Sequence, residues 1–355
     1  MDEPCDPLYG PPARTQGETE GKTQGESLAD LGEWELIRRL AAFAPPGQFA
    51  DDAALLNEPH PQQGALVVNT DVLVEGLHFS ETTTGPADVG WRAAAANFSD
   101  LAAMGCTEVV GITVGLVAPA STPWPWVEGV YQGISDALRC HGGVLLGGDC
   151  SGGAQRLLAI TALGRLSRDS GPIRRGDGRP GDLLICSGPH GLSRLGLALL
   201  QGELTSDDPA LIQRAIHAHQ HPVPRFDAVR ALIGSRPTPT TWRVGGCDSS
   251  DGLVAAAAAI ASASGCAARL DRQALPLDAA MACLPKAEAW CLGGGEDFEL
   301  VLALEPAWAE ALRSELPGAS LIGQLEAGRP GTLGWADGEP WPMDKAIVSG
   351  FRHFG

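Results

Sequence analysis

The chain has 355 residues, a length that favours two domains over one. Hydrophobic residues make up 44% of it, which excludes a disordered protein. Its formal net charge of −18 argues against nucleic acid or an anionic membrane surface as the main partner, because both are polyanions. The nine cysteines include no CxxC pair, so a zinc site is not expected, and their odd number with the lack of an apolar N-terminal segment predicts a cytoplasmic protein with reduced thiols.

The first half of the chain alternates predicted helices and strands. Residues 1–26 are rich in Gly, Pro, Thr and Glu and predict a flexible tail, after which a helix is expected to begin near Ser27. Residues 143–149 predict a strand that runs into a glycine turn. Apolar and β-branched patterns predict further strands and helices, with strands over 65–74, 108–118 and 157–166, and helices over 87–105 and 125–142.

The second half repeats this mixture after RRGDGRPGD (174–182), a segment dense in turn signals that predicts a domain boundary. Strands are expected over 182–188 and 298–304, and helices over 191–200 and 253–265. The predicted fold class is therefore a two-domain α/β (α+β) protein, with an N-terminal domain over 27–166 and a C-terminal α/β domain over 167–355. Alanine-rich helices predict close packing between the layers.

Six short acidic segments recur along the chain, each with a carboxylate at the end of an apolar segment or in a glycine turn: FADDAALL, NTDVLVEGLHF, NFSDLAAMG, GGDCSGG, DSSDGL and GGGEDFEL. One such segment is explained by a helix cap or a turn, where Asp is favoured in any case. Six of the same character favour hard-cation binding, because Mg²⁺ takes oxygen ligands and bridges carboxylates to substrate phosphates. The chain has no Walker A, HRD or GxSxG segment.

Read together and in order, these segments resemble the thiamine-monophosphate kinase family, which shares a superfamily with aminoimidazole ribonucleotide synthetase and selenophosphate synthetase. NFSDLAAMG and GGEDFEL are the superfamily segments, whereas TDVLVEGLHF with the C-terminal GFRHFG favours the thiamine-phosphate member. The match runs from about residue 28 to the end. It implies an N-terminal mixed β-sheet domain that forms a homodimer through β-structure, and an active site in the cleft between the domains.

The resemblance also implies an activity and a set of sites. The activity is ATP- and Mg²⁺-dependent phosphorylation of thiamine monophosphate to thiamine diphosphate, the last step of thiamine diphosphate biosynthesis, with several Mg²⁺ ions and no catalytic base. Carried over position by position, the metal ligands fall on Asp52, Asn69, Thr70, Asp71, Asp100, Asp149, Asp248 and Asp251, the ATP contacts on Gly148, Asp149, Arg175 and Ser250, and the substrate contacts on His78, Glu296 and Phe351.

Ala50, Gly152, Leu192 and Arg352 stand where the family usually has Gly, Arg, Asp and Asp. These departures spare the expected carboxylates but bear on the phosphate cradle. Two alternatives therefore stay open: another ATP-dependent enzyme of the superfamily, or a non-catalytic nucleotide- or metal-binding homologue. A selenophosphate synthetase would carry a reactive Cys near the start of the fold, whereas Cys5 lies in the predicted tail.

Overall fold

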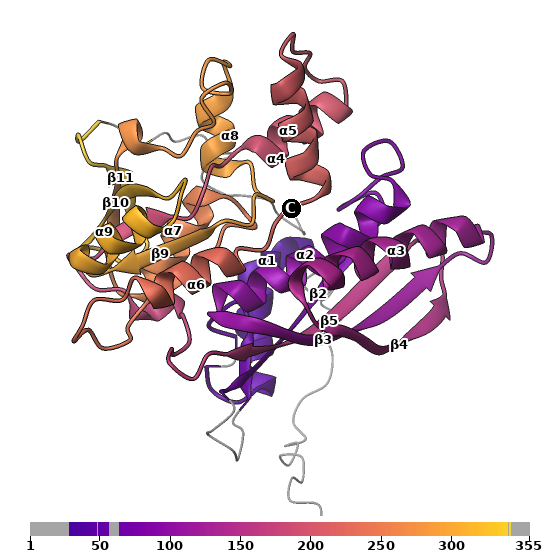
Figure 1. Ribbon diagram of the computed structural model, residues 1–355, viewed down its shortest axis with the longest axis horizontal. Helices are drawn as coiled ribbons and strands as arrows, with labels where there is room; N and C mark the ends of the chain where they lie inside the picture. Colours follow the sequence, from indigo (N-terminus) through magenta and orange to yellow (C-terminus); the bar gives the residue numbers. More distant parts are fainter. Residues whose placement is uncertain (1–27, 48, 57–63, 340, 342–355) are drawn as a thin grey trace, which may run out of the picture.

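The computed structural model describes residues 28–47, 49–56, 64–339 and 341, which form two β-sheets with helices packed against them (Figure 1). The first sheet has the strand order β1-β2-β5-β3-β4. Its β3–β4 pair is parallel and its other pairs are antiparallel, so the expected mixed sheet is confirmed. The strands are β1 (Ala54–Leu56), β2 (Leu66–Val74), β3 (Cys106–Ala118), β4 (Val144–Gly152) and β5 (Leu157–Leu166).

Strand β4 corrects one prediction, because it continues through the expected glycine turn to Gly152. Its parallel pairing with β3 carries on through Gly148, Asp149 and Gly152. Gly148 makes this approach possible, since a Cβ there would lie 2.0 Å from the carbonyl oxygen of Val114. Asp149 therefore sits within a strand at the edge of the sheet.

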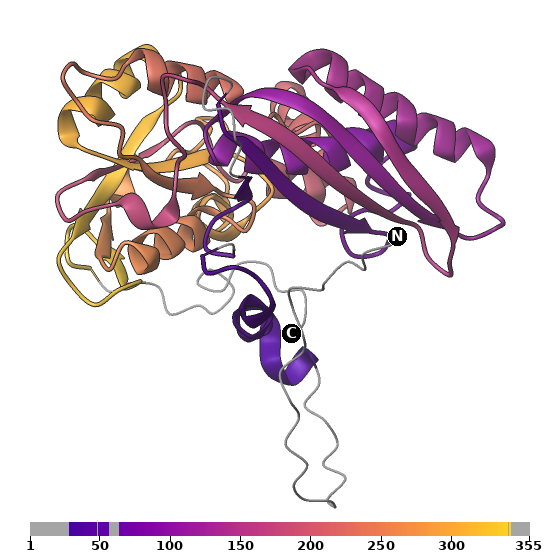
Figure 2. The same ribbon diagram turned by 90° about the horizontal axis from the view of Figure 1, so that it is seen from below.

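Helices α2 (Pro86–Ala103) and α3 (Trp124–His141) cover one face of the first sheet (Figure 1). Their backbones meet at two glycines: a Cβ on Gly90 would lie 1.9 Å from the Val130 carbonyl oxygen, and one on Gly133 would lie 1.9 Å from that of Ala87. This contact joins two helices of the same layer through glycines, whereas the predicted close packing between layers concerned alanines. Figure 2 shows the opposite face of the sheet, across which no helix of the described residues lies.

The second sheet has the strand order β11-β8-β10-β6-β9-β7. All of its pairs are antiparallel except β11–β8. Its strands are β6 (Leu183–Cys186), β7 (Gly245–Asp248), β8 (Ala267–Leu270), β9 (Leu300–Leu304), β10 (Ser320–Glu326) and β11 (Leu333–Trp335), and the helices of this half are α4 (Leu192–Leu200), α5 (Pro209–Gln220), α6 (Phe226–Gly234), α7 (Leu253–Ala263), α8 (Ala287–Gly293) and α9 (Pro306–Glu315).

Both faces of the second sheet are buried, as the alternation along β9 shows. Leu300, Leu302 and Leu304 pack into the core that contains α6, α9 and the first sheet, whereas Val301 and Ala303 pack under α7. A strand buried on both faces reads as a continuous apolar run, which is how residues 300–304 read in the sequence. One apolar core therefore continues from the first sheet to the second.

The C-terminal end of α5 attaches the second half of the chain to α2. The Trp91 indole donates to the carbonyl oxygen of Pro222 over 2.9 Å, and Gln220 donates to that of Thr83 over 2.8 Å. His221 lies 2.8 Å from a carboxylate oxygen of Asp88. Helix α1 (Leu28–Leu40) is interrupted at Gly32, and the predicted cap Ser27 and the predicted tail lie outside the described residues. No helix in the described ranges has the length and apolar character needed to cross a membrane.

Candidate active site

Three carboxylates that are far apart in the sequence meet where the two halves of the chain join. Asp52 precedes β1, Asp100 lies in the last turn of α2, and Asp248 ends β7. Each offers an oxygen atom within 4.8 Å of the others, and we refer to these three residues as the acid cluster. All three were expected as metal ligands, and the fold brings them together.

The acid cluster is short of positive charge. Burial, the larger cause, and the charge of Asp71 raise the pKa of Asp100 well above its usual range. Burial likewise raises the pKa of Asp52 to about 7, although the Arg175 guanidinium, which pairs with Asp52, opposes this shift. Burial also raises the pKa of Asp248, against a 2.6 Å hydrogen bond from the Ser99 hydroxyl. A divalent cation with oxygen ligands would supply the missing charge, so these residues fit the expected Mg²⁺.

Asn69 and Asp71 lie on the α2 face of β2, beside the acid cluster. The Asn69 side-chain amide donates to Asp100 over 2.7 Å, and the Asp71 backbone N–H donates to the Asn97 side chain over 3.2 Å. Because side chains alternate along a strand, Thr70 points to the other face, where its hydroxyl lies 2.8 Å from that of Thr161. The expected ligand set is therefore divided between the two faces of the sheet.

Asp149 is also separate from the acid cluster. Its strand partner is Gly115, which aligns through Ala159 with Val72 on β2. Three strand spacings, about 14 Å in all, therefore separate Asp149 from β2. Gly152, one of the four departures, ends the same strand, and the fold of the single chain does not bring this segment to the acid cluster.

A cavity of about 1040 Å³ opens beside the acid cluster, and we call it the junction cavity. Residues from both halves of the chain line it. Its wall joins expected metal and ATP residues to two of the expected substrate contacts, and the members that matter here are Asp71, Asp100, Ser250, Asp251, His78 and Glu296.

His78 has a fixed orientation at the wall of this cavity. Its Nδ1 accepts a 3.0 Å hydrogen bond from the Val74 backbone N–H. In the neutral ring the proton is then on Nε2. The turn after β2 thus presents His78 as a donor rather than as a free base.

Glu296 lies on a strained loop. Its φ is 57° and that of Phe298 is 52°, a left-handed conformation that non-glycine residues rarely adopt. The Glu296 N–H donates to the Ser250 carbonyl oxygen over 2.7 Å. Asp297 accepts hydrogen bonds from the backbone N–H groups of Gly191 and Ser193, at 2.6 and 3.0 Å. Asp297 thus provides a carboxylate at the N-terminus of α4, where Leu192 replaces the family's usual Asp.

Arg175, an expected ATP contact, already has acidic partners. Its guanidinium pairs with Asp52 and its backbone N–H donates to Asp51 over 2.8 Å. Ser250 lines the junction cavity and lies next to Asp251. The expected substrate contact Phe351, and the departure Arg352, lie outside the described residues.

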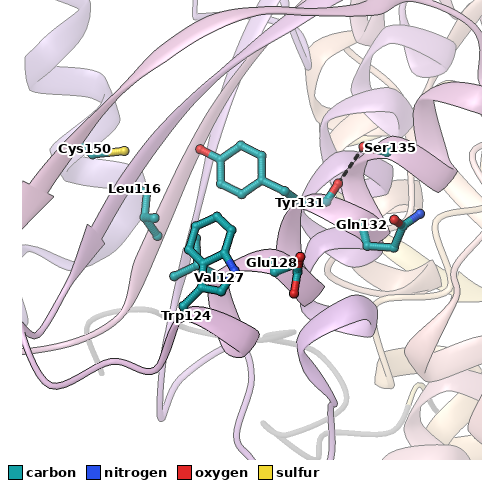
Figure 3. Close-up of a pocket in the computed structure, with 8 residues that line it drawn as sticks. All are labelled: Leu116, Trp124, Val127, Glu128, Tyr131, Gln132, Ser135 and Cys150. Atoms are coloured by element: carbon teal, nitrogen blue, oxygen red, sulfur yellow. Dashed lines mark hydrogen bonds between the residues drawn. The ribbon is translucent and has the colours of Figure 1, made fainter.

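A second cavity, of about 450 Å³, lies between α3 and the strands β3 and β4, and we call it the α3 cavity (Figure 3). Leu116, Trp124, Val127 and Tyr131 form its mostly apolar wall, and Cys150 completes it. Figure 3 shows the Tyr131 hydroxyl directed toward Cys150, with the Trp124 ring beside the Tyr131 ring. Cys150 directly follows Asp149 in β4, but neither of the expected ATP contacts Gly148 and Asp149 lines this cavity.

Sequence reasoning missed two residues of these cavities. Tyr131 reads as an ordinary helical aromatic residue, and only its place on the helix before GGD could have drawn attention to it. Arg92 reads as one exposed charge in an alanine-rich helix, yet it is 4% exposed and lines the junction cavity. The sequence offered no signal for the burial of Arg92.

Comparisons with known proteins show which family the chain and its fold resemble. Models of the N-terminal and the C-terminal domain of AIR synthase related proteins match residues 50–166 and 179–336. Thiamine-monophosphate kinase of Prochlorococcus marinus is 47% identical over 93% of this chain and 98% of the relative, and that of Synechococcus elongatus is 49% identical over 84% and 90%. The solved structure of AaThiL complexed with AMPPCP and TMP has a TM-score of 0.77 and 27% identity, over 92% of this chain and 99% of that one.

Proposed function

The chain belongs to the thiamine-monophosphate kinase family, and we propose from this membership that it transfers the γ-phosphoryl group of ATP to thiamine monophosphate, giving thiamine diphosphate and ADP. The related structure with AMPPCP, an ATP analogue, and TMP supports this pair of substrates. The two relatives near half identity carry the kinase name, which favours this reaction over the other superfamily activities and over a non-catalytic role.

The observation that carries the proposal is the junction cavity. One continuous space borders the carboxylates of Asp71, Asp100 and Asp251, and also borders His78 and Glu296. A phosphorylated cation needs both kinds of surface, because its phosphate requires metal-bearing acids and its ring requires oriented polar groups. We therefore place the phosphate of thiamine monophosphate toward the carboxylates and its rings toward His78 and Glu296.

We propose that Mg²⁺ binds at the acid cluster, with Asn69, Asp71 and Asp251 beside it. These residues would hold the ion, and it would supply positive charge to neutralise the phosphates. Thr70 and Asp149 remain proposed ligands on the other face of the sheet. Several ions would explain why the expected oxygen ligands are divided between two places.

No residue of the chain needs to act as a general base, because the acceptor phosphate carries no proton that must be removed. A phosphate monoester has a second pKa of about 6, so its oxygen is already a nucleophile at neutral pH. Catalysis then depends on in-line positioning and charge neutralisation. His78 and Glu296 orient the acceptor, and Phe351 is proposed to stack on its ring system.

For ATP we propose that the adenine occupies the α3 cavity, between Trp124 and Tyr131. A planar base suits aromatic walls. Arg175 and Ser250 remain proposed contacts to the triphosphate.

Two further proposals concern the state of the protein. We propose a homodimer formed through the uncovered face of the first sheet, where Val72 on β2 and Val144 and Leu146 on β4 are large exposed apolar residues. A molar mass measured by light scattering would test it. The eight cysteines in the described ranges are free thiols, which supports the proposed cytoplasmic location.

The function is tested by incubating the purified protein with ATP, Mg²⁺ and thiamine monophosphate and measuring thiamine diphosphate by chromatography. Product formation is expected. Its absence at saturating substrates would leave the two alternatives, another ATP-dependent enzyme of the superfamily and a non-catalytic homologue. We expect Asp71→Asn to abolish turnover while the protein stays folded. Near-normal turnover of that variant at saturating Mg²⁺ would contradict the metal assignment.

A further inference from the structure

Arg92 is a buried cation in the wall of the junction cavity. It lies on α2, in the first half of the chain, and is 4% exposed. A buried guanidinium is retained only where acceptors surround it. Its acceptors are therefore informative about what the residue does.

These acceptors belong to three separate segments. The guanidinium donates to the His78 carbonyl oxygen over 3.2 Å, to the backbone carbonyl oxygen of His219 on α5, and to the Glu296 carboxylate over 2.7 Å. Arg92 thus connects α2 with the turn after β2 and with two parts of the second half. The planar fork of arginine can serve several acceptors at once, which a lysine ammonium cannot do in the same geometry.

The orientation of the Glu296 carboxylate depends on its ion pair with Arg92, because its contact with His219 is weak. Its second carboxylate oxygen lies 3.6 Å from Nδ1 of His219, too far for a hydrogen bond. Burial and the charge of Arg92 lower the pKa of His219 to about 4, so this imidazole is neutral at physiological pH. Arg92 is then the cation that pairs with the Glu296 carboxylate and orients it.

We propose that Arg92 is a positioning residue for the acceptor substrate: it sets the Glu296 carboxylate toward the junction cavity and thereby determines the affinity for the positively charged ring of thiamine monophosphate. This inference rests on the proposed function and on Glu296 as a substrate contact. Arg92 acts through Glu296, and the binding of ATP does not depend on it.

The contact between the two halves of the chain does not rest on Arg92 alone. The neighbouring Trp91 donates to Pro222, and Gln220 donates to Thr83, so α5 remains attached to α2 without the guanidinium. Trp91→Phe removes one hydrogen bond across the same contact and leaves Arg92 and Glu296 intact. It is therefore the matched control for a purely structural effect.

The test measures KM for each substrate, kcat and the Tm for the wild type, Arg92→Met, Glu296→Gln, the double variant and Trp91→Phe. We expect Arg92→Met to raise KM for thiamine monophosphate at least tenfold, which is about 1.4 kcal/mol, with KM for ATP changed less than about twofold. The double variant should be no worse than Glu296→Gln alone, within about twofold, because both changes remove the same interaction. Trp91→Phe should leave both KM values within about twofold of the wild type.

Three results would overturn the inference. In the double variant, the two single-variant increases in KM for thiamine monophosphate could multiply. Alternatively, Arg92→Met could raise both KM values equally, or Trp91→Phe could raise KM for thiamine monophosphate alone. If Arg92→Met does not fold, Arg92→Lys, which keeps the charge, takes its place in the test. We then expect a smaller rise in KM for thiamine monophosphate, again with KM for ATP nearly unchanged. If the wild type forms no thiamine diphosphate, the proposed function fails separately. The inference is then tested by the calorimetric Kd of thiamine monophosphate across the same variants.

Discussion

The acid cluster predicts that Asp100→Asn stabilises the metal-free protein. The pKa of Asp100 is higher in the folded protein than in the unfolded chain. At any pH between these two pKa values, the carboxyl is therefore protonated in the folded protein and ionised in the unfolded chain. The stabilising contribution of such a group is fully present below its unfolded pKa and is lost as the pH rises. An asparagine resembles the protonated acid and avoids this loss.

The magnitude follows from the pH of the measurement. Against an unfolded pKa of about 3.9, the carboxyl costs at most about 5 kcal/mol at about pH 7.5 and about 1.5 kcal/mol at about pH 5. Asp100 borders the junction cavity, where solvent lowers the cost, so we expect a gain below this limit that is larger at the higher pH than at about pH 5. The Asn69 hydrogen bond to residue 100 survives, because an amide oxygen also accepts.

Urea unfolding followed by tryptophan fluorescence measures this gain, in chelator and at both pH values. Asp207→Asn, at an exposed aspartate outside the acid cluster, is the control and should change the free energy of unfolding little. In Mg²⁺ the wild type should recover stability and Asp100→Asn should recover less. The reasoning is refuted if Asp100→Asn is no more stable than the wild type in chelator at the higher pH, or if the gain is the same at both pH values.

Two other residues give sharp expectations. Tyr131→Leu should raise KM for ATP about tenfold and leave KM for thiamine monophosphate within about twofold, since base–aromatic stacking contributes about 1–3 kcal/mol; steady-state kinetics with each substrate varied decides this. His190, whose pKa burial lowers to about 4, stays neutral in the fold while the unfolded chain takes up a proton below about pH 6.5. The contribution of His190 to the free energy of unfolding is thus lost as the pH falls. Between about pH 7 and pH 5, urea unfolding should show that the wild type loses about 2 kcal/mol more of this free energy than His190→Gln does.

The acidic segments were visible in the sequence because Asp at the end of an apolar run is a local pattern. Their convergence was not visible, since Asp100 and Asp248 are far apart in the sequence and only the packing of α2 against β7 brings them within 4.8 Å. Asp149 illustrates the opposite error. Its glycine neighbours suggested a turn, whereas those glycines allow β4 to pack closely against β3.

Short elements of the second half escaped prediction for a related reason. Strand β7 consists of Gly245, Gly246, Cys247 and Asp248, which have no β propensity as a group, and it is a strand because β9 pairs with it. Helices α5 and α6 flank HPVPR, whose prolines mask the helical pattern on either side. The domain boundary after residue 166 remains a prediction, because one core runs across it.

The junction between the two halves is therefore a balance of opposed interactions. Ionised Asp52 and Asp100, from the first half, would repel an ionised Asp248 from the second, so without a cation the acid cluster either takes up protons or favours separation. Arg92, Trp91 and the end of α5 act in the opposite direction with hydrogen bonds across the same contact. Binding of a divalent cation would remove the repulsion and leave the attractive contacts unopposed. The arrangement thus couples metal binding to the geometry of the junction cavity, and with it to the position of Glu296 opposite the acceptor.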